Sequence, residues 1–135
     1  MGANLKFNSA ICTSREQSER LIALGLKKET ADCIWCEVRT LSKDNPIQWH
    51  LLPEYIDKYD EKHIPAWSLH RLIEMCPLIP NPARFLAVTS FKTVYVRMND
   101  EMDVSYAGKG TYNNLINCIE WLIKEGYFNK DYLEK

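Results

Sequence analysis

The sequence lacks the charge excess that would mark a protein of duplex nucleic acid. Its 17 Lys and Arg residues stand against 18 Asp and Glu residues, a formal net charge of −1. Duplex binders usually carry a basic excess or a basic stripe, because phosphate contacts supply most of their affinity. The nearest approach to such a stripe is the pair Lys27 and Lys28. We therefore do not expect duplex nucleic acid as a partner.

Long apolar runs are also missing. The longest stretches hold only a few residues, far fewer than the ~20 that span a bilayer. The first twelve residues contain no run that could form the core of a signal peptide. We therefore expect a protein that is neither exported nor inserted into a membrane. A chain of 135 residues, 46% of them apolar, is expected to form one globular domain over residues 1–135.

The cysteines have no framework spacing. They are odd in number and scattered along the chain: Cys12, Cys33, Cys36, Cys76 and Cys118. Secreted domains usually show even and patterned cysteines, and a free thiol among apolar neighbours packs as a small core residue. The pattern predicts packed thiols in a cytoplasmic protein.

Three segments have the apolar spacing of helices. Residues 15–24 follow Ser14, which with Gln17 has the spacing of a capping box. A second helix is expected after Ser68, ending at Pro77. Residues 111–125 carry the longest apolar stripe.

Strand signals occupy the intervening segments. The best candidates are residues 33–40, 84–90 and 93–98, with a short one at 104–106. In the third candidate Val94 and Val96 alternate with Tyr95, so one face is apolar and the other amphipathic. We predict an α+β fold, with a small antiparallel sheet of three to four strands and two to three helices packed on one of its faces.

Three places in the chain carry a resemblance. They are Thr13, Gln17, Leu21, Leu24 and Gly25 near the start, residues 65–72 in the middle, and residues 121–127 near the end. With these the chain resembles a group of short proteins of Bacteroides-type gut bacteria, often encoded on prophage-like or mobile elements. The resemblance implies no activity, cofactor or site residue.

Cys33 and Cys36 have the spacing of a metal or redox pair. A zinc site needs four ligands, yet His50, His63 and His70 do not lie three to five residues apart. On a strand the two thiols would also point to opposite faces. We therefore expect no metal, no cofactor and no catalytic residues, and we interpret the pair as two packed thiols.

Two other segments offer weaker chemistry. Gly108, Lys109, Gly110 and Thr111 open the last helix, where backbone amides could hold an anion; a plain turn with Thr111 as N-cap explains them equally well.

A second group, Asp57, Asp60, Glu61 and His63, has ligand types that suit a divalent ion. A solvated acidic helix face explains this group as well.

The aromatic residues are numerous, and exposed aromatics mark interfaces. Those with the least obvious burial are Trp35, Trp49, Tyr95 and Tyr127, which we predict as interaction residues. The leading hypothesis is a non-enzymatic protein that binds another protein or itself, for example as a homodimer and an accessory protein of a mobile element. The alternative is a small-ligand-binding protein or an enzyme that uses residues 108–111 or the acidic–histidine group.

A third hypothesis is single-strand nucleic-acid binding through exposed aromatics on the sheet. That mode needs a basic groove, for which only Arg84, Lys92 and Arg97 are available.

Overall fold

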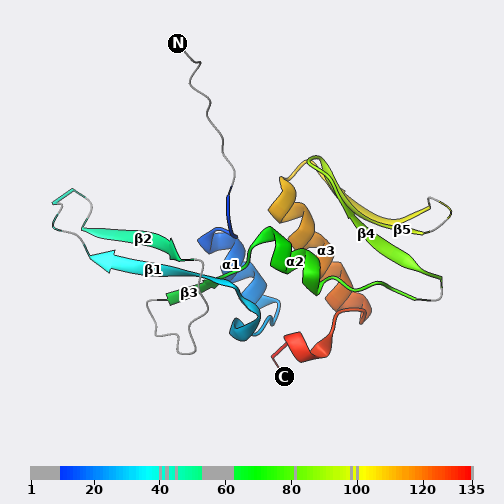
Figure 1. Ribbon diagram of the computed structural model, residues 1–135, viewed down its shortest axis with the longest axis horizontal. Helices are drawn as coiled ribbons and strands as arrows, with labels where there is room; N and C mark the ends of the chain where they lie inside the picture. Colours follow the sequence, from blue (N-terminus) through cyan, green and yellow to red (C-terminus); the bar gives the residue numbers. More distant parts are fainter. Residues whose placement is uncertain are drawn as a thin grey trace, which may run out of the picture.

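The computed structural model describes residues 10–39, 41, 43–44, 46–52, 63–80, 82–97, 99 and 101–134. Three α-helices lie between two three-stranded antiparallel sheets (Figure 1). The predicted α+β class is confirmed, with the strands divided between two sheets. The helices are α1 (Arg15–Ala23), α2 (Leu69–Met75) and α3 (Thr111–Glu125), and the short 3₁₀ turns are η1 (Lys28–Thr30) and η2 (Lys130–Tyr132). The strands are β1 (Cys33–Arg39), β2 (Ile47–Leu52), β3 (His63–Ala66), β4 (Arg84–Val88), β5 (Lys92–Arg97) and β6 (Met102–Ala107).

The helix starts follow from local capping. The Ser14 hydroxyl accepts a hydrogen bond from the Gln17 N–H at 3.1 Å, and the Gln17 side chain accepts one from the Ser14 N–H at 2.9 Å, which completes the expected capping box. Ser68 is the N-cap of α2, as expected. For α3 the N-cap is Gly110 rather than Thr111, and its φ of 87° is one that glycine adopts readily.

The strands β4, β5 and β6 form the body sheet, in the order β4-β5-β6. Its inner face packs on α3, where the Tyr95 ring lies 5.8 Å from the Trp121 ring. Leu86 and Val104, the neighbours of Tyr95 in the sheet, contact the same core. The buried residues of this main core come mostly from the helices and include Leu21, Trp67, Leu72, Tyr95, Leu115, Ile119 and Leu122.

The strands β1, β2 and β3 form the arm sheet, in the order β2-β1-β3. The β1–β2 hairpin projects away from the helices (Figure 1). β3 pairs only with the first half of β1, through Cys33 to Cys36, and it contains Pro65. Proline is tolerated there because β3 is an edge strand, which needs fewer backbone donors. A small second core of Cys12, Cys33 and Ala66 lies beneath this sheet.

A short polar joint connects the arm sheet to the helices. The backbone N–H of Trp67, which follows β3, donates to the Thr13 hydroxyl at 3.1 Å, and its indole N–H donates to the Thr30 hydroxyl at 2.9 Å. The Ser68 N–H donates to Asp32 at 2.8 Å. Since Trp67 is fully buried, these bonds fix the exit of the arm sheet against the main core. No helix among the described residues has both the length and the apolar character needed to cross a bilayer.

Candidate functional site

Two of the predicted interaction residues lie together on the arm sheet. Trp35 and Trp49 lie on the same face of the arm sheet, since Trp35 is opposite Leu51 and Trp49 is opposite Glu37 in the β1–β2 pairing. Contacts with Thr13 and Arg15 show that this face is turned toward the start of α1. The Trp35 indole donates to the Thr13 carbonyl at 3.0 Å, and the Arg15 guanidinium lies 4.7 Å from the centre of the Trp49 ring. Both rings are half-buried and already have contacts within the chain.

The other two predicted interaction residues lie around Trp121. Tyr95 is fully buried, and its hydroxyl donates to the Pro77 carbonyl at 2.8 Å. Burial, followed by the nearby Cys76, raises the pKa of Tyr95, which keeps the phenol neutral. Tyr95 is therefore a core residue and offers no surface to a partner. Tyr127 is 38% exposed and packs between Trp121 and Arg84, with ring distances of 5.7 and 5.0 Å.

The burial of Tyr95 leaves the opposite face of the body sheet apolar and outward. Because β5 presents Tyr95 to α3, Val94 and Val96 point to the other side, where Val94 is buried by its neighbours and Val96 is half-buried. Val96 pairs with Phe85 on β4 and with Met102 on β6, which are 42% and 55% exposed. We call these residues, with Val94 and its neighbours Ala87 and Ser105, the outer face. Its two rows of cross-strand neighbours hold no Asp, Glu, Lys or Arg.

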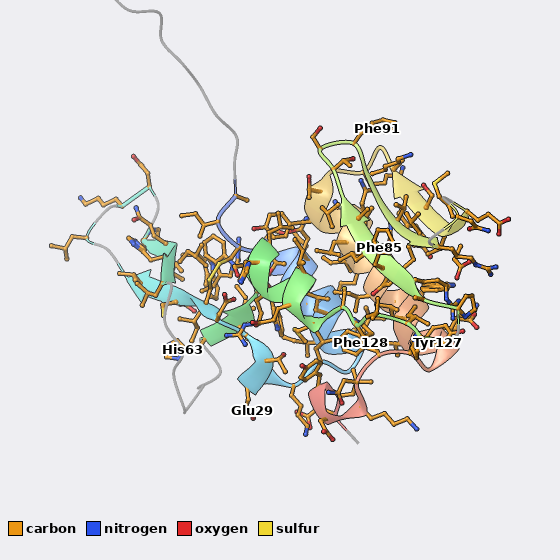
Figure 2. All side chains as sticks on the ribbon, turned by 45° about the vertical axis from the view of Figure 1, so that its right-hand side comes forward. Glu29, His63, Phe85, Phe91, Tyr127 and Phe128 are labelled. Atoms are coloured by element: carbon orange, nitrogen blue, oxygen red, sulfur yellow. A yellow bond between two sulfur atoms is a disulfide. The ribbon has the colours of Figure 1, made fainter. Side chains whose placement is uncertain are left out.

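The two rows of the outer face carry no charged side chain. Phe85 is seen on β4, and Phe91 at the end of the β4–β5 hairpin (Figure 2). Phe91 is 66% exposed and extends the apolar surface beyond the strands. Aromatic and long apolar side chains of this kind are enriched at protein interfaces. Of the possible sites, the outer face therefore has the character of a contact surface.

Two of the three residues available for a basic groove are paired with an acidic side chain. Arg84 and Arg97 both bind Asp103, through N–O distances of 2.5 and 2.8 Å. The hydrogen bond from Arg84 lowers the pKa of the Asp103 carboxyl below its ordinary value, so the carboxylate stays charged at neutral pH. The Asp103 carboxylate therefore offsets much of the positive charge of Arg84 and Arg97. Single-strand nucleic-acid binding, which needs a basic groove, loses this support.

The predicted anion-binding residues form an exposed turn. The Gly108 N–H donates to the Phe91 carbonyl and the Lys109 N–H to the Asn114 side chain, each at 3.3 Å. Gly110 and Thr111 begin α3 without a side-chain cap. Two of the amides expected to hold an anion are therefore engaged within the chain, and Lys109 points from an exposed position.

The acidic–histidine group lies mostly outside the described residues. Asp57, Asp60 and Glu61 belong to the undescribed segment 53–62, and only His63 is placed, at the start of β3. Among the described residues, no three His, Cys, Asp or Glu side chains are arranged around a common point as a metal site.

The cysteine pair behaves differently from the prediction. Cys33 and Cys36 do lie on opposite faces of β1, but Cys33 is joined to Cys12 in a disulfide rather than packed as a free thiol. The 21-residue separation of Cys12 and Cys33 gave no sequence signal, because the pairing depends on how β1 folds back onto the segment before α1.

A second arrangement that sequence spacing missed lies on the other face of β1. Cys36 pairs in register with His50 on β2 and with His63 on β3. Directly opposed residues of neighbouring strands point to the same side of a sheet. The structure therefore aligns an imidazole, a thiol and an imidazole in one row. These residues are 13 to 27 positions apart in the chain, so only knowledge of the strand pairing could have joined them.

Comparison of the chain with protein-family models, with curated proteins and with solved structures gave no match.

Proposed function

We propose that this chain is a non-enzymatic interaction protein that self-associates through the outer face of the body sheet. The observation that carries the proposal is the orientation of β5, which turns Tyr95 into the core and Val96 to the opposite face. Phe85 and Met102 flank Val96 on the two neighbouring strands and remain 42% and 55% exposed, while Val94 beside them is buried. Exposed apolar side chains of this kind gain stability when a second surface covers them.

A second copy of the chain is the occupant that the charge pattern favours. In a two-fold contact each surface meets itself, so any charged group near the axis would face its own like charge. The row of Phe85, Val96 and Met102 contains no charge, and the row of Ala87, Val94 and Ser105 contains none either. Lys92 pairs with Ala107 at the end of the outer face. This position is at the rim of the proposed contact, where the charge of Lys92 stays in solvent. The net charge of −1 adds little repulsion between copies.

The test is the oligomeric state of a charged variant. We expect the wild-type chain to sediment as a dimer at micromolar concentration, and Phe85→Lys to sediment as a monomer with unchanged circular dichroism. Leu41→Lys is the matched control, because Leu41 is fully exposed and lies between β1 and β2 of the arm sheet. This control should remain dimeric. A wild-type monomer at every concentration, or a dimer that tolerates Phe85→Lys, would contradict the proposal.

We also propose a cytoplasmic location and a role on a mobile element. Three cysteines, Cys36, Cys76 and Cys118, lie outside the disulfide, which supports a cytoplasmic location; the resemblance of the sequence supports a role as an accessory protein of a mobile element. Disulfides are rare in a reducing compartment. We therefore expect Cys12 and Cys33 to be reduced in the cell and their disulfide to form when the protein is oxidised. A cytoplasmic protein that is denatured and alkylated at the moment of lysis should carry the label on all five cysteines, whereas a label on three would contradict this location.

A further inference from the structure

The row of His50, Cys36 and His63 crosses the three strands of the arm sheet on one face. Cys36 is on the central strand β1, and the two histidines are its direct partners on β2 and β3. His50 is exposed, while Cys36 and His63 are half-buried. His63 and Phe85 lie at opposite sides of the molecule (Figure 2). The row is therefore separate from the outer face and independent of the proposed self-association.

The order of the three residues suits the reach of their side chains. Neighbouring strands lie about 4.8 Å apart, so a point above the central strand is closer to Cys36 than to the two flanking residues. A thiolate binds zinc at about 2.3 Å through a short side chain, and an imidazole binds at about 2.0–2.1 Å through a longer one. The short ligand is in the centre and the long ones are at the sides, which allows all three to reach one ion.

We infer that His50, Cys36 and His63 form a binding site for a single divalent transition-metal ion of the zinc class. One thiolate and two imidazoles are donors that zinc prefers, and three protein ligands leave a fourth position for water or another ligand. The side chains in the structure do not yet converge on one point. Cys36 and His63 also have other interactions within the chain. Binding therefore requires rotation about the side-chain bonds and the exchange of those interactions for bonds to the ion, and the rotation is easiest for the exposed His50.

The remaining cysteines do not compete for the same ion. Cys33 points to the opposite face of β1 and is held in the disulfide with Cys12. Cys118 is buried, and burial raises the pKa of its thiol to about 12. Burial also raises the pKa of Cys76. A thiol must lose its proton to bind metal, which disfavours Cys76 and Cys118, whereas Cys36 is the cysteine that lies in register with the two histidines.

Zinc competition against a chromophoric chelator, with the disulfide intact, tests the site. We expect the full chain to bind one equivalent of zinc, and His50→Gln to lower the affinity by about 100-fold, because even changes behind a ligand cost about 10–100-fold. His70→Gln is the matched control, since His70 is an exposed histidine on α2. The control should bind as tightly as the wild type. Equal binding by the two variants, or no binding by the wild type, would overturn the inference.

Cobalt supplies a readout that identifies the thiolate directly. Cobalt bound through sulfur shows a charge-transfer absorption in the near ultraviolet, and we expect this band for the wild type and for His70→Gln. Cys36→Ser should abolish the band. Thermal unfolding of each variant without metal checks that the fold is retained, and His50→Gln changes an exposed side chain, so it tests the site even if Cys36→Ser fails to fold. A band that persists in Cys36→Ser would place the thiolate elsewhere and overturn the assignment.

Discussion

The body sheet and the arm sheet have the same number of strands but are stabilised differently. The main core beneath the body sheet contains fourteen buried apolar residues, most of them supplied by the three helices, whereas the core beneath the arm sheet contains three. Hydrophobic burial therefore stabilises the body sheet. The arm sheet depends on specific links, namely the Cys12–Cys33 disulfide and the hydrogen bonds of Thr13 with Trp35 and Trp67.

This difference shows where each kind of function fits. A sheet that is held rigidly from one side can present its other side as a fixed apolar surface, as the outer face does. A sheet with a small core and an exposed hairpin can adjust its side chains around an ion. The two proposals therefore assign self-association to the body sheet and metal binding to the arm sheet.

The largest effect is expected from the main core. Leu122 on α3 is fully buried among the helices and the body sheet, so Leu122→Ala should lower the free energy of unfolding by about 3–4 kcal/mol through lost burial and the cavity left behind. Urea denaturation followed by circular dichroism measures this change. Both sheets should unfold in one transition, because the arm sheet has no independent core. An arm sheet that outlasts α3 would show instead that it folds alone.

An intermediate effect is expected from the disulfide. Cys12 and Cys33 are 21 residues apart, and opening a loop of that size should cost about 3 kcal/mol through the regained entropy of the unfolded chain. Comparison of oxidised and reduced protein in urea gives the value. Hydrogen exchange should show that reduction loosens β1 and β2 before α3.

A double variant provides the control for this comparison. Cys12→Ala with Cys33→Ala removes the disulfide from the start, so added reductant should leave its stability unchanged. Loss of protection in α3 at the same reductant concentration as in β1 would show that reduction unfolds the whole domain instead of loosening the arm sheet first.

Local signals made much of the fold predictable. The capping box of Ser14 and Gln17 and the helix start after Ser68 depend on neighbours within a few positions, and the structure confirms them. The strands expected at 84–90 and 93–98 also form, as β4 and β5. The short strand β3 was not predictable, because His63–Ala66 has no alternation of its own and gains its structure only by pairing with β1.

The candidate sites were less predictable, since each depends on contacts far apart in the chain. The alternation of Val94 and Val96 with Tyr95 indicated two different faces but not which of them lies against the helices. The face of Tyr95 packs on α3, where the Tyr95 hydroxyl donates to the Pro77 carbonyl, and this bond lowers the cost of burying the phenol. The same dependence on distant contacts explains why no spacing rule could join Cys36 to its two histidines.

The smallest effect is expected from the ion pairs at the end of the body sheet. Asp103 is 11% exposed and is held by Arg84 and Arg97. Because the hydrogen bond from Arg84 lowers the pKa of Asp103 in the folded chain, the carboxylate stabilises the fold above its unfolded pKa of about 3.9. That contribution is lost as the pH falls through the lowered pKa.

Asp103→Asn isolates this contribution. At neutral pH the variant should melt a few degrees below the wild type, and the two melting curves should converge in acid, where Asp103 of the wild type is protonated. Arg71 and Glu74 supply the matched control, because they form an exposed ion pair on α2, and exposed pairs contribute little. Glu74→Gln should therefore change the melting temperature hardly at all. A gap between wild type and Asp103→Asn that stays constant into acid would show that the side-chain shape, rather than the charge, holds this end of the body sheet.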